Sequence, residues 1–306
     1  MDRTGWATHC FGRFLIDLPP GSALKAGNRI WGEPIESLSV AERSLSEQID
    51  ARVSELEGTP HEFRESMLVR HTDLARGSAS IVSWAQPYSL VAMQSETFLI
   101  AGERDAPVFF RYSGLVSPEK LESALAFYED LARKIRSRRP DEIPTEPGFC
   151  IDGGYIAGSE FMAESFRVGI TMPGHPGMHM TFRSSTGAEE DTLLERVGGF
   201  FRTEVLGRVA GMNTLRKGKR SVGPIAGEEY LVAGGDRQQR MYAFRWEFQG
   251  RDGSLAKPNL SLQMGVHERD PDDDGNPPPP AFESDREALE LWDAVLQSIR
   301  LRPGAA

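Results

Sequence analysis

Two stretches of the chain repeat apolar residues at intervals of three and four positions, which is the spacing of one helical face. The first stretch, SPEKLESALAFYEDLARKIRSRRP, offers Ser117 as a cap and Pro118 in the first turn. The second, SDREALELWDAVLQSIRLRP, has Ser284 and Glu287 at the spacing of a capping box. The predicted buried faces are two matching sets of five: Ala124, Phe127, Tyr128, Leu131 and Ile135, then Ala288, Leu291, Trp292, Val295 and Ile299.

The segments ahead of each helix show the period-two alternation and the short apolar runs of strands. In the first half, FGRFLIDLP and ALKAGNRIWG precede a predicted helix around residues 40–57, and four strand-like segments follow it. In the second half, CIDGGYIAG, SFRVGITM and MHMTFRSS precede a predicted helix near 189–209, and three strand-like segments follow. Tyr242, Phe244, Trp246 and Phe248 alternate with Ala243, Arg245 and Glu247, which predicts one buried face of a strand.

The two halves therefore follow one plan of strands, helix, strands and helix. This plan predicts an α+β protein with two similar domains, 1–140 and 141–306, formed by internal duplication. Each domain is expected to contain an antiparallel-rich sheet packed with two helices. Between them, RRPDEIPTEPG at residues 138–148 is rich in proline, which is typical of an exposed connector.

The chain has only two cysteines, Cys10 and Cys150, and each opens the first strand-like segment of its half. Two interpretations stay open at this point. The thiols are either two buried small hydrophobic groups or a disulfide formed in an oxidising compartment. A disulfide would close a loop of about 140 residues, and the chain-entropy model assigns such a loop roughly 4 to 5 kcal/mol of stabilisation.

The 306-residue chain has a net charge of −10 and a pI near 5.2, and these values argue against a nucleic-acid partner. A protein partner with a basic surface suits such a charge better. No stretch approaches the roughly 20 apolar residues needed to span a bilayer, so no integral membrane segment is expected. The start, MDRTGWATHCFG, lacks the apolar core of a signal peptide.

Familiar catalytic and cofactor motifs are missing: there is no Gly-x-Ser-x-Gly elbow, no phosphate-binding loop and no His-Glu-x-x-His helix. His175 and His179 supply only two of the three or four ligands that zinc prefers. The acidic run from Asp270 to Gly275 resembles the start of an EF-hand loop, but Ala281 stands where the bidentate glutamate belongs. We therefore expect no metal and no cofactor, and we interpret the basic run at 215–221 as an exposed turn or strand start.

Two segments, THCFGRFLIDLP near the start and PGFCIDGGYIAG in the middle, resemble the hallmark segments of bacterial immunity proteins that neutralise lipase effectors (Tle) of the type VI secretion system. The resemblance extends over nearly the whole chain, including the two-half layout and the last helix with Trp292. It implies a non-enzymatic inhibitor that binds a cognate lipase effector in the periplasm and protects the producing cell and its kin. Residence in the cytoplasm is the alternative, since the chain shows no export signal.

Loops on a rigid scaffold often carry recognition, so three exposed segments are hypothetical effector contacts. They contribute the following residues: Asp272, Asp273 and Asp274; His175 and His179; Asp141 and Glu142. One rival hypothesis is a small-molecule or lipid-binding protein that uses a groove between the halves. The other is a hydrolase with Asp152, Glu160, His175 or His179 as acid–base groups.

Overall fold

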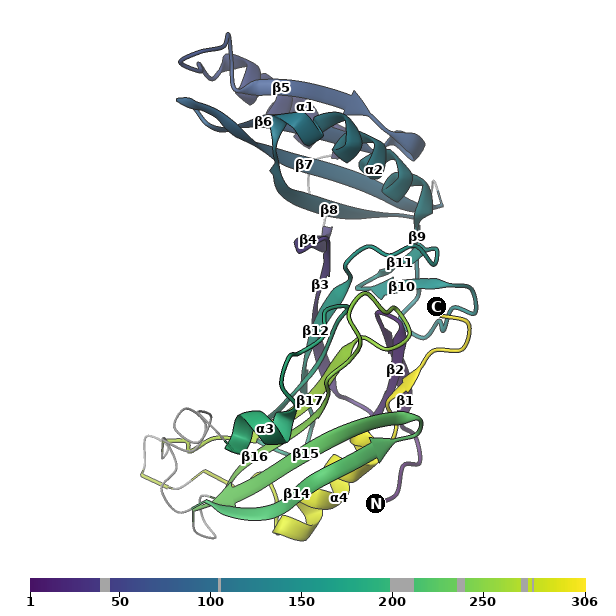
Figure 1. Cartoon of the computed structure of the whole chain (residues 1–306), viewed down its shortest axis with the longest axis vertical. Coiled ribbons are helices and arrows are strands. Elements are labelled where there is room, and N and C mark those ends of the chain that lie inside the picture. Colours follow the sequence, from purple (N-terminus) through teal and green to yellow (C-terminus); the bar gives the residue numbers. More distant parts are fainter. Residues whose placement is uncertain (39–44, 104–105, 199–211, 236–239, 271–274, 277) are drawn as a thin grey trace. The chain divides into compact units, whose positions relative to one another are not determined.

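The computed structural model describes the whole chain except residues 39–44, 104–105, 199–211, 236–239, 271–274 and 277. Antiparallel strand pairs account for most of the residues in helices and strands in the described part, and a few helices pack on the sheets (Figure 1). The predicted α+β class with antiparallel-rich sheets is therefore confirmed.

The chain forms two compact units, and each unit draws on both halves of the sequence. Unit 1 contains residues 1–26, 143–145 and 159–306, and unit 2 contains residues 27–142 and 146–158. These units differ from the expected domains 1–140 and 141–306. The difference arises because one short hairpin from each half belongs to the unit formed mainly by the other half.

Each exchanged hairpin pairs with a strand from the other half of the sequence. In unit 1, β1 (Ala7–Phe11) and β2 (Phe14–Leu18) form a hairpin, and β18 (Arg300–Leu301) pairs with β2. In unit 2, β10 (Gly148–Ile151) and β11 (Gly154–Ala157) form a hairpin, and β9 (Ile135–Ser137) pairs with β11. Segments predicted as single strands are thus hairpins, which turn at Gly12 and Gly153 with positive φ.

Unit 2 has a larger sheet with the strand order β3-β4-β8-β7-β6-β5. Its members are β3 (Ala23–Ile30), which begins in unit 1, and β4 (Glu33–Leu38), β5 (Leu68–Asp73), β6 (Ala79–Gln86), β7 (Ser89–Glu103) and β8 (Ala106–Val116). Two α-helices, α1 (Leu45–Gly58) and α2 (Leu121–Lys134), belong to this unit, with short 3₁₀ turns at Ala75–Gly77 and Pro118–Lys120. The strand β4 was not predicted.

Unit 1 has a larger sheet with the order β14-β15-β16-β17-β13-β12, and the start of β3 lies beside β12. Its strands are β12 (Ser165–Thr171), β13 (Met178–Ser185), β14 (Asn213–Val222), β15 (Ile225–Gly234), β16 (Met241–Phe248) and β17 (Asn259–Val266). The helices among its described residues are α3 (Leu193–Gly198) and α4 (Asp285–Leu296). The basic run at 215–221 lies within β14, the edge strand of this sheet.

One face of β16 forms the core under α4, as its alternation predicted. Tyr242, Phe244 and Trp246 are buried, whereas Phe248 is only half-buried. The Phe244 ring packs edge-on against Trp292 with centroids 5.7 Å apart. The five residues predicted as the inner face of the last helix are all buried, although α4 ends before Ile299. The other face of β16 carries Ala243, Arg245 and Glu247.

The helix starts were predicted with mixed success. Ser284 caps α4 by accepting a hydrogen bond from the Glu287 amide. Ser117 caps nothing, because its hydroxyl instead donates to the Glu119 carboxylate at 2.5 Å. On α2, Tyr128 and Leu131 are buried as predicted, whereas Ala124 and Phe127 are only half-buried. The predicted helices around 40–57 and near 189–209 each extend into residues outside the described part.

A buried ion pair fixes the first hairpin within unit 1. Arg13 is 2% exposed and Glu164 is 3% exposed. The Arg13 Nε and Nη2 atoms lie 2.8 and 2.6 Å from the two Glu164 oxygens, and Nη1 donates to the Ala305 carbonyl. Burial raises the pKa of Glu164, although the Arg13 guanidinium opposes this shift.

We expect Arg13→Met to lower the free energy of unfolding by roughly 3 to 5 kcal/mol, because Glu164 would be left buried without its cation. The double variant Arg13→Met with Glu164→Leu should recover most of this loss, since an apolar pair of similar volume replaces the charges. Urea denaturation followed by tryptophan fluorescence measures both values. A single variant as stable as the wild type would contradict the structural role given to this pair.

Candidate interaction surface

The face of the unit 1 sheet opposite α4 has a row of small residues at its centre. Antiparallel pairing places Val232 beside Ala243, Ala243 beside Gly265, and Gly265 beside His179. The next row on the same face consists of Tyr230, Arg245, Gln263 and Thr181. Ala243 contributes only a methyl group and Gly265 no side chain, so β16 and β17 carry no large side chain in the first row.

Above this row lies a hollow of about 280 Å³, which we call the α3 hollow. Leu193, Arg196 and Val197 of α3 form one wall. The floor and the other walls come from Tyr230, Val232, Ala243, Phe244, Arg245, Gln263, Met264, Gly265, His179 and His267. The hollow thus combines an apolar floor with polar side chains around it.

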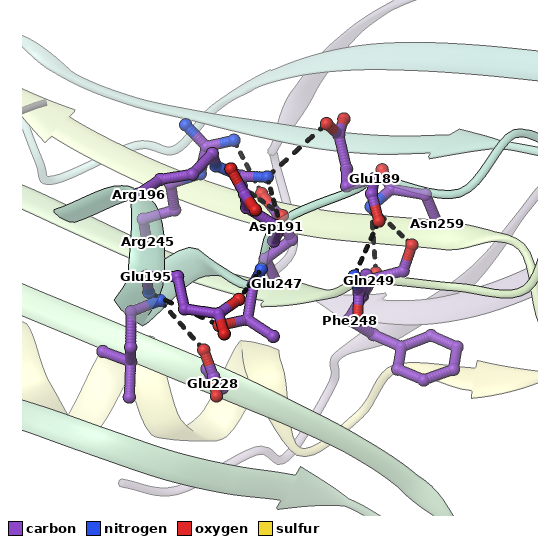
Figure 2. Close-up of polar contacts among 12 residues, drawn as sticks. Glu189, Asp191, Glu195, Arg196, Glu228, Arg245, Glu247, Phe248, Gln249 and Asn259 are labelled. Atoms are coloured by element: carbon purple, nitrogen blue, oxygen red, sulfur yellow. Dashed lines mark hydrogen bonds and ion pairs between the residues drawn. The ribbon is translucent and has the colours of Figure 1, made fainter. Parts of the chain in front are cut away.

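The short helix α3 is held in place by side chains at its start. Thr192 and Glu195 form a reciprocal pair: the Glu195 carboxylate accepts from the Thr192 amide at 2.7 Å, and the Thr192 hydroxyl accepts from the Glu195 amide at 3.4 Å. This is the capping-box arrangement. Glu228 of β15 also accepts from the Leu194 amide at 2.9 Å, so the sheet itself caps the helix (Figure 2).

Arg196 and Arg245 share one buried carboxylate beside the hollow. Glu247 is 3% exposed. Its Oε1 accepts from Arg196, and its Oε2 accepts from Arg245 Nη2 at 2.7 Å (Figure 2). Arg196 also donates to the Asp191 carbonyl at 2.9 Å. Arg196 also forms an ion pair with Glu189 at 3.5 Å. Glu247 and Glu189 therefore offset both guanidinium charges between them.

His179 and His267 stack at another side of the hollow, with ring centroids 4.9 Å apart and an interplanar angle of 25°. A Cβ atom at Gly265 would lie 2.6 Å from the His179 ring, so glycine at this position lets the ring lie over β17. Partial burial lowers the pKa of His179, and repulsion from His267 lowers it further.

The structure gives the two histidines of the predicted turn different neighbours. His179 belongs to the α3 hollow. The His175 ring instead packs against Phe282 at a tilt of 33° with centroids 4.7 Å apart, and its Nδ1 lies 2.9 Å from the Ala281 carbonyl oxygen. Among the described residues, no group of three or more histidines, cysteines or carboxylates could hold a metal ion.

The connector residues proposed as contacts lie in unit 2 and are both paired. Asp141 is 80% exposed and faces Arg139 at 3.4 Å. Glu142 is 30% exposed and forms an ion pair with Arg136 at 2.7 Å. The connector is not exposed throughout, because Pro144 is buried and its carbonyl accepts from Arg302 at 2.6 Å. Asp272, Asp273 and Asp274 lie outside the described residues.

The acid–base groups of the hydrolase hypothesis are distributed over both units. Asp152 is exposed at the β10–β11 turn of unit 2, whereas Glu160 belongs to unit 1 and is also exposed. His175 and His179 have the separate partners described above. The geometry of these described residues gives no support to a shared acid–base pair.

Comparison with known proteins identifies the family of the chain. The model of the Tle cognate immunity protein 4 C-terminal domain matches residues 142–304, more than half of the sequence. A chain in the crystal structure of the Tle4–Tli4 complex is 48% identical, with both chains covered over 100% and a TM-score of 0.93. The chain belongs to the Tle cognate immunity protein 4 family.

Two structures of the immunity protein TplEi from Pseudomonas aeruginosa are also similar to the present chain. The apo structure is 47% identical with a TM-score of 0.91, and 99% of each chain is covered. The structure complexed with "L" peptide is 47% identical with a TM-score of 0.85, covering 99% of this chain and 100% of that one. Comparison with curated protein sequences gave no match.

Both cysteines of this family member are buried, Cys10 at 2% and Cys150 at 1% exposure. In the structure neither cysteine is a free thiol, because both are in the disulfide form. Among the described helices, none has both the length and the apolar character that crossing a bilayer requires.

Sequence reasoning missed a group of exposed apolar side chains in unit 2. Phe63 is 55% exposed, Tyr88 63% and Val91 79%. Tyr88 lies at the turn between β6 and β7, close to where Glu62 donates its amide to the Pro87 carbonyl at 2.8 Å. No signal marked these residues, because alternation does not reveal which strand ends lack a covering element.

We expect the apparent pKa of His179 to lie below its usual 6.5, and His267→Gln to raise it toward that value. Since the unfolded chain would take up a proton that folded His179 resists, stability should fall as the pH drops through 6.5 toward the lowered pKa. Titration of the imidazole Cε1 proton by NMR measures the midpoint. A midpoint at or above 6.5 would contradict this account of the histidine pair.

Proposed function

We propose that this protein is an immunity protein that binds and inhibits a lipase effector of the type VI secretion system, and so protects the producing cell and its kin. The observation that carries the proposal is the likeness, over its full length and at 48% identity, to a chain of the Tle4–Tli4 complex. This likeness extends over the whole of both chains.

The protein acts as a binding partner and not as an enzyme. Specific complexes commonly bury about 1,600 Å² of surface in total, and neither a metal nor a nucleophile is needed for that. The net charge of −10 favours rapid encounter with a basic surface of the effector. The acidic residues Asp272, Asp273 and Asp274, the His175–His179 turn, and Asp141 with Glu142 are proposed contacts within this function.

Within this function we place the protein in the periplasm, where disulfides persist. A bond between Cys10 and Cys150 suits that compartment, because both sulfurs are buried and in the disulfide form. The bond would link the first strands of the two exchanged hairpins, β1 and β10.

The two halves of the chain arose by internal duplication. The support is the repeated order and pairing of elements. The first half runs β1–β4, α1, β5–β8, α2 and β9, and the second runs β10–β13, α3, β14–β17, α4 and β18. The ladder between β4 and β8 has its counterpart in the ladder between β13 and β17. The exchanged hairpins occupy equivalent positions in the two halves.

Purified protein should inhibit the lipase activity of its cognate effector in proportion to its concentration, and its expression in the periplasm should protect cells that receive that effector. Fluorogenic phospholipid hydrolysis and a competition assay measure the two effects. The control is an unrelated periplasmic protein of similar size and charge. Full lipase activity at a large molar excess of this protein would overturn the proposed function.

Protein taken from the periplasm should contain no free thiol, and its mass should rise by two hydrogens when it is reduced. Cys10→Ala and Cys150→Ala should lower stability by similar amounts, since each removes the same constraint on the unfolded chain, worth roughly 4 to 5 kcal/mol in the entropy model. The double variant should cost no more than either single variant. Two alkylatable thiols in native protein would contradict the bond.

A further inference from the structure

We propose that a hollow of about 440 Å³ beside β4, β8 and α2 receives a cationic side chain from the surface of the lipase effector. This inference rests on the proposed function, and it names the chemistry of one contact on the side of the partner. We call the site the Glu33 hollow. Its described lining residues all belong to unit 2, and they include one carboxylate and four aromatic side chains.

The described residues that flank the gaps in unit 2 lie toward the other end of the sheet. The residues on either side of 39–44 both pack in the cluster that includes Phe109. The residues on either side of 104–105 pair with each other at the start of β8. Leu115, which lines the hollow, is six residues beyond Phe109 along β8, or about 20 Å at the rise of a strand.

Glu33 places a half-buried carboxylate at this end of the sheet. It stands two residues before Ile35, which pairs with Tyr112, so its side chain lies on the same face of the sheet as the Tyr112 ring. Gly114 leaves room for it, because a Cβ atom at Gly114 would lie 2.5 Å from Glu33 Cγ. Among the described residues, none donates a hydrogen bond to the Glu33 carboxylate or forms an ion pair with it.

The two tyrosines near this carboxylate use their hydroxyl hydrogens elsewhere. Tyr112 donates to the Ile30 carbonyl at 3.1 Å, and Tyr128 donates to Ser95 Oγ at 2.8 Å. Burial raises the pKa of both phenols, and the negative charge of Glu33 raises it further. A half-buried carboxylate in these surroundings gains most from a positively charged donor that a partner brings.

The other charges on this side of unit 2 balance one another. Lys120 also lines the hollow, but it is exposed, and its charge is offset by the adjacent Glu119. Glu122 forms an ion pair with Arg70 at 2.7 Å. Glu33 is therefore the carboxylate left over, and its sign agrees with the acidic balance of the whole chain.

Aromatic rings line the hollow together with the carboxylate, and the faces of such rings attract cations. Tyr112, Phe127 and Tyr128 pack together with ring centroids 5.7, 5.8 and 5.9 Å apart. Trp31 lines the same hollow and is 52% exposed. Arginine suits this combination best, because its guanidinium both pairs with a carboxylate and stacks on aromatic faces.

Trp31 occupies a position that is unfavourable for the backbone of a tryptophan. With Gly32 it forms the two-residue turn between β3 and β4, and both residues have positive φ, as a type I′ turn requires. Asparagine, aspartate and glycine are the usual residues in such a turn, and a bulky residue at positive φ is an outlier. A large, exposed ring at this position supports a role in recognition.

The experiment measures the affinity of the complete protein for the cognate effector by calorimetry, at one pH and salt concentration. Glu33→Gln removes the charge and keeps the shape of the side chain. Trp31→Asn removes the ring and supplies a residue that tolerates positive φ. Glu36→Gln is the matched control, since Glu36 lies on the same strand, pairs with Arg111 on the other face and does not line the hollow. Thermal melting confirms that each variant is folded.

Glu33→Gln should weaken binding by at least about tenfold, the scale of one lost charge-assisted hydrogen bond. Trp31→Asn should weaken it by about threefold, since an exposed cation–π contact contributes less. Glu36→Gln should stay within about twofold of the wild type. Wild-type affinity in either hollow variant, or an equal loss in Glu36→Gln, would overturn the cation site and leave the proposed function intact. A wild-type protein that fails to bind the effector would instead overturn the function itself.

A second measurement separates a cationic occupant from an apolar one. The probes are acetyl-arginine amide and acetyl-norleucine amide, and NMR follows the indole resonance of Trp31, which the Trp31→Asn variant assigns. The arginine probe should shift this resonance in the wild type, and it should shift the resonance less in Glu33→Gln. No shift by the arginine probe, or an equal shift by the norleucine probe, would overturn the proposal.

Discussion

The contacts of Arg13 hold unit 1 together, because its side chain and its backbone carbonyl join the first hairpin to two segments that are distant in the sequence. Its guanidinium holds the Glu164 carboxylate and the Ala305 carbonyl, and its backbone carbonyl accepts from Arg302 at 2.8 Å. A guanidinium buried to 2% exposure is acceptable only while all these partners are present. The first hairpin, the loop before β12 and the last residues therefore form one cooperative cluster, and the neighbouring sheet is built against it.

The α3 hollow lies where two strands of the unit 1 sheet carry almost no side chain. Ala243 and Gly265 bring almost nothing to the centre of the face, and the capped turn of α3 sets Arg196 at the edge of the space they leave. The buried Glu247 holds both guanidiniums, and the exposed Glu189 pairs with Arg196 as well, so two carboxylates face the two arginines. Charge placed on packed strands and on a short capped helix is positioned before any partner arrives, which lowers the entropic cost of binding.

Local patterns were sufficient for the elements whose stability is local. The last helix, its cap at Ser284 and the buried alternation of Tyr242, Phe244 and Trp246 follow from spacing alone. Hairpin exchange could not be predicted, because period-two patterns in β2 and β18 say nothing about which strands pair. The α3 hollow was missed for a similar reason: only the register brings Ala243, Gly265 and His179 into one row. His179 was singled out in the sequence, but beside His175 and not beside His267.

The chain is synthesised from its N-terminus, and the exchanged hairpins therefore determine the order in which the two units can fold. Unit 2 needs nothing beyond Gly158, so it is able to assemble while later residues are still being added. The apolar strand β2 has no such freedom, since its partner β18 lies at Arg300–Leu301 and is synthesised almost last. Unit 1 thus stays open until translation is nearly complete, with an unpaired hydrophobic edge that holdase chaperones can recognise in the nascent protein.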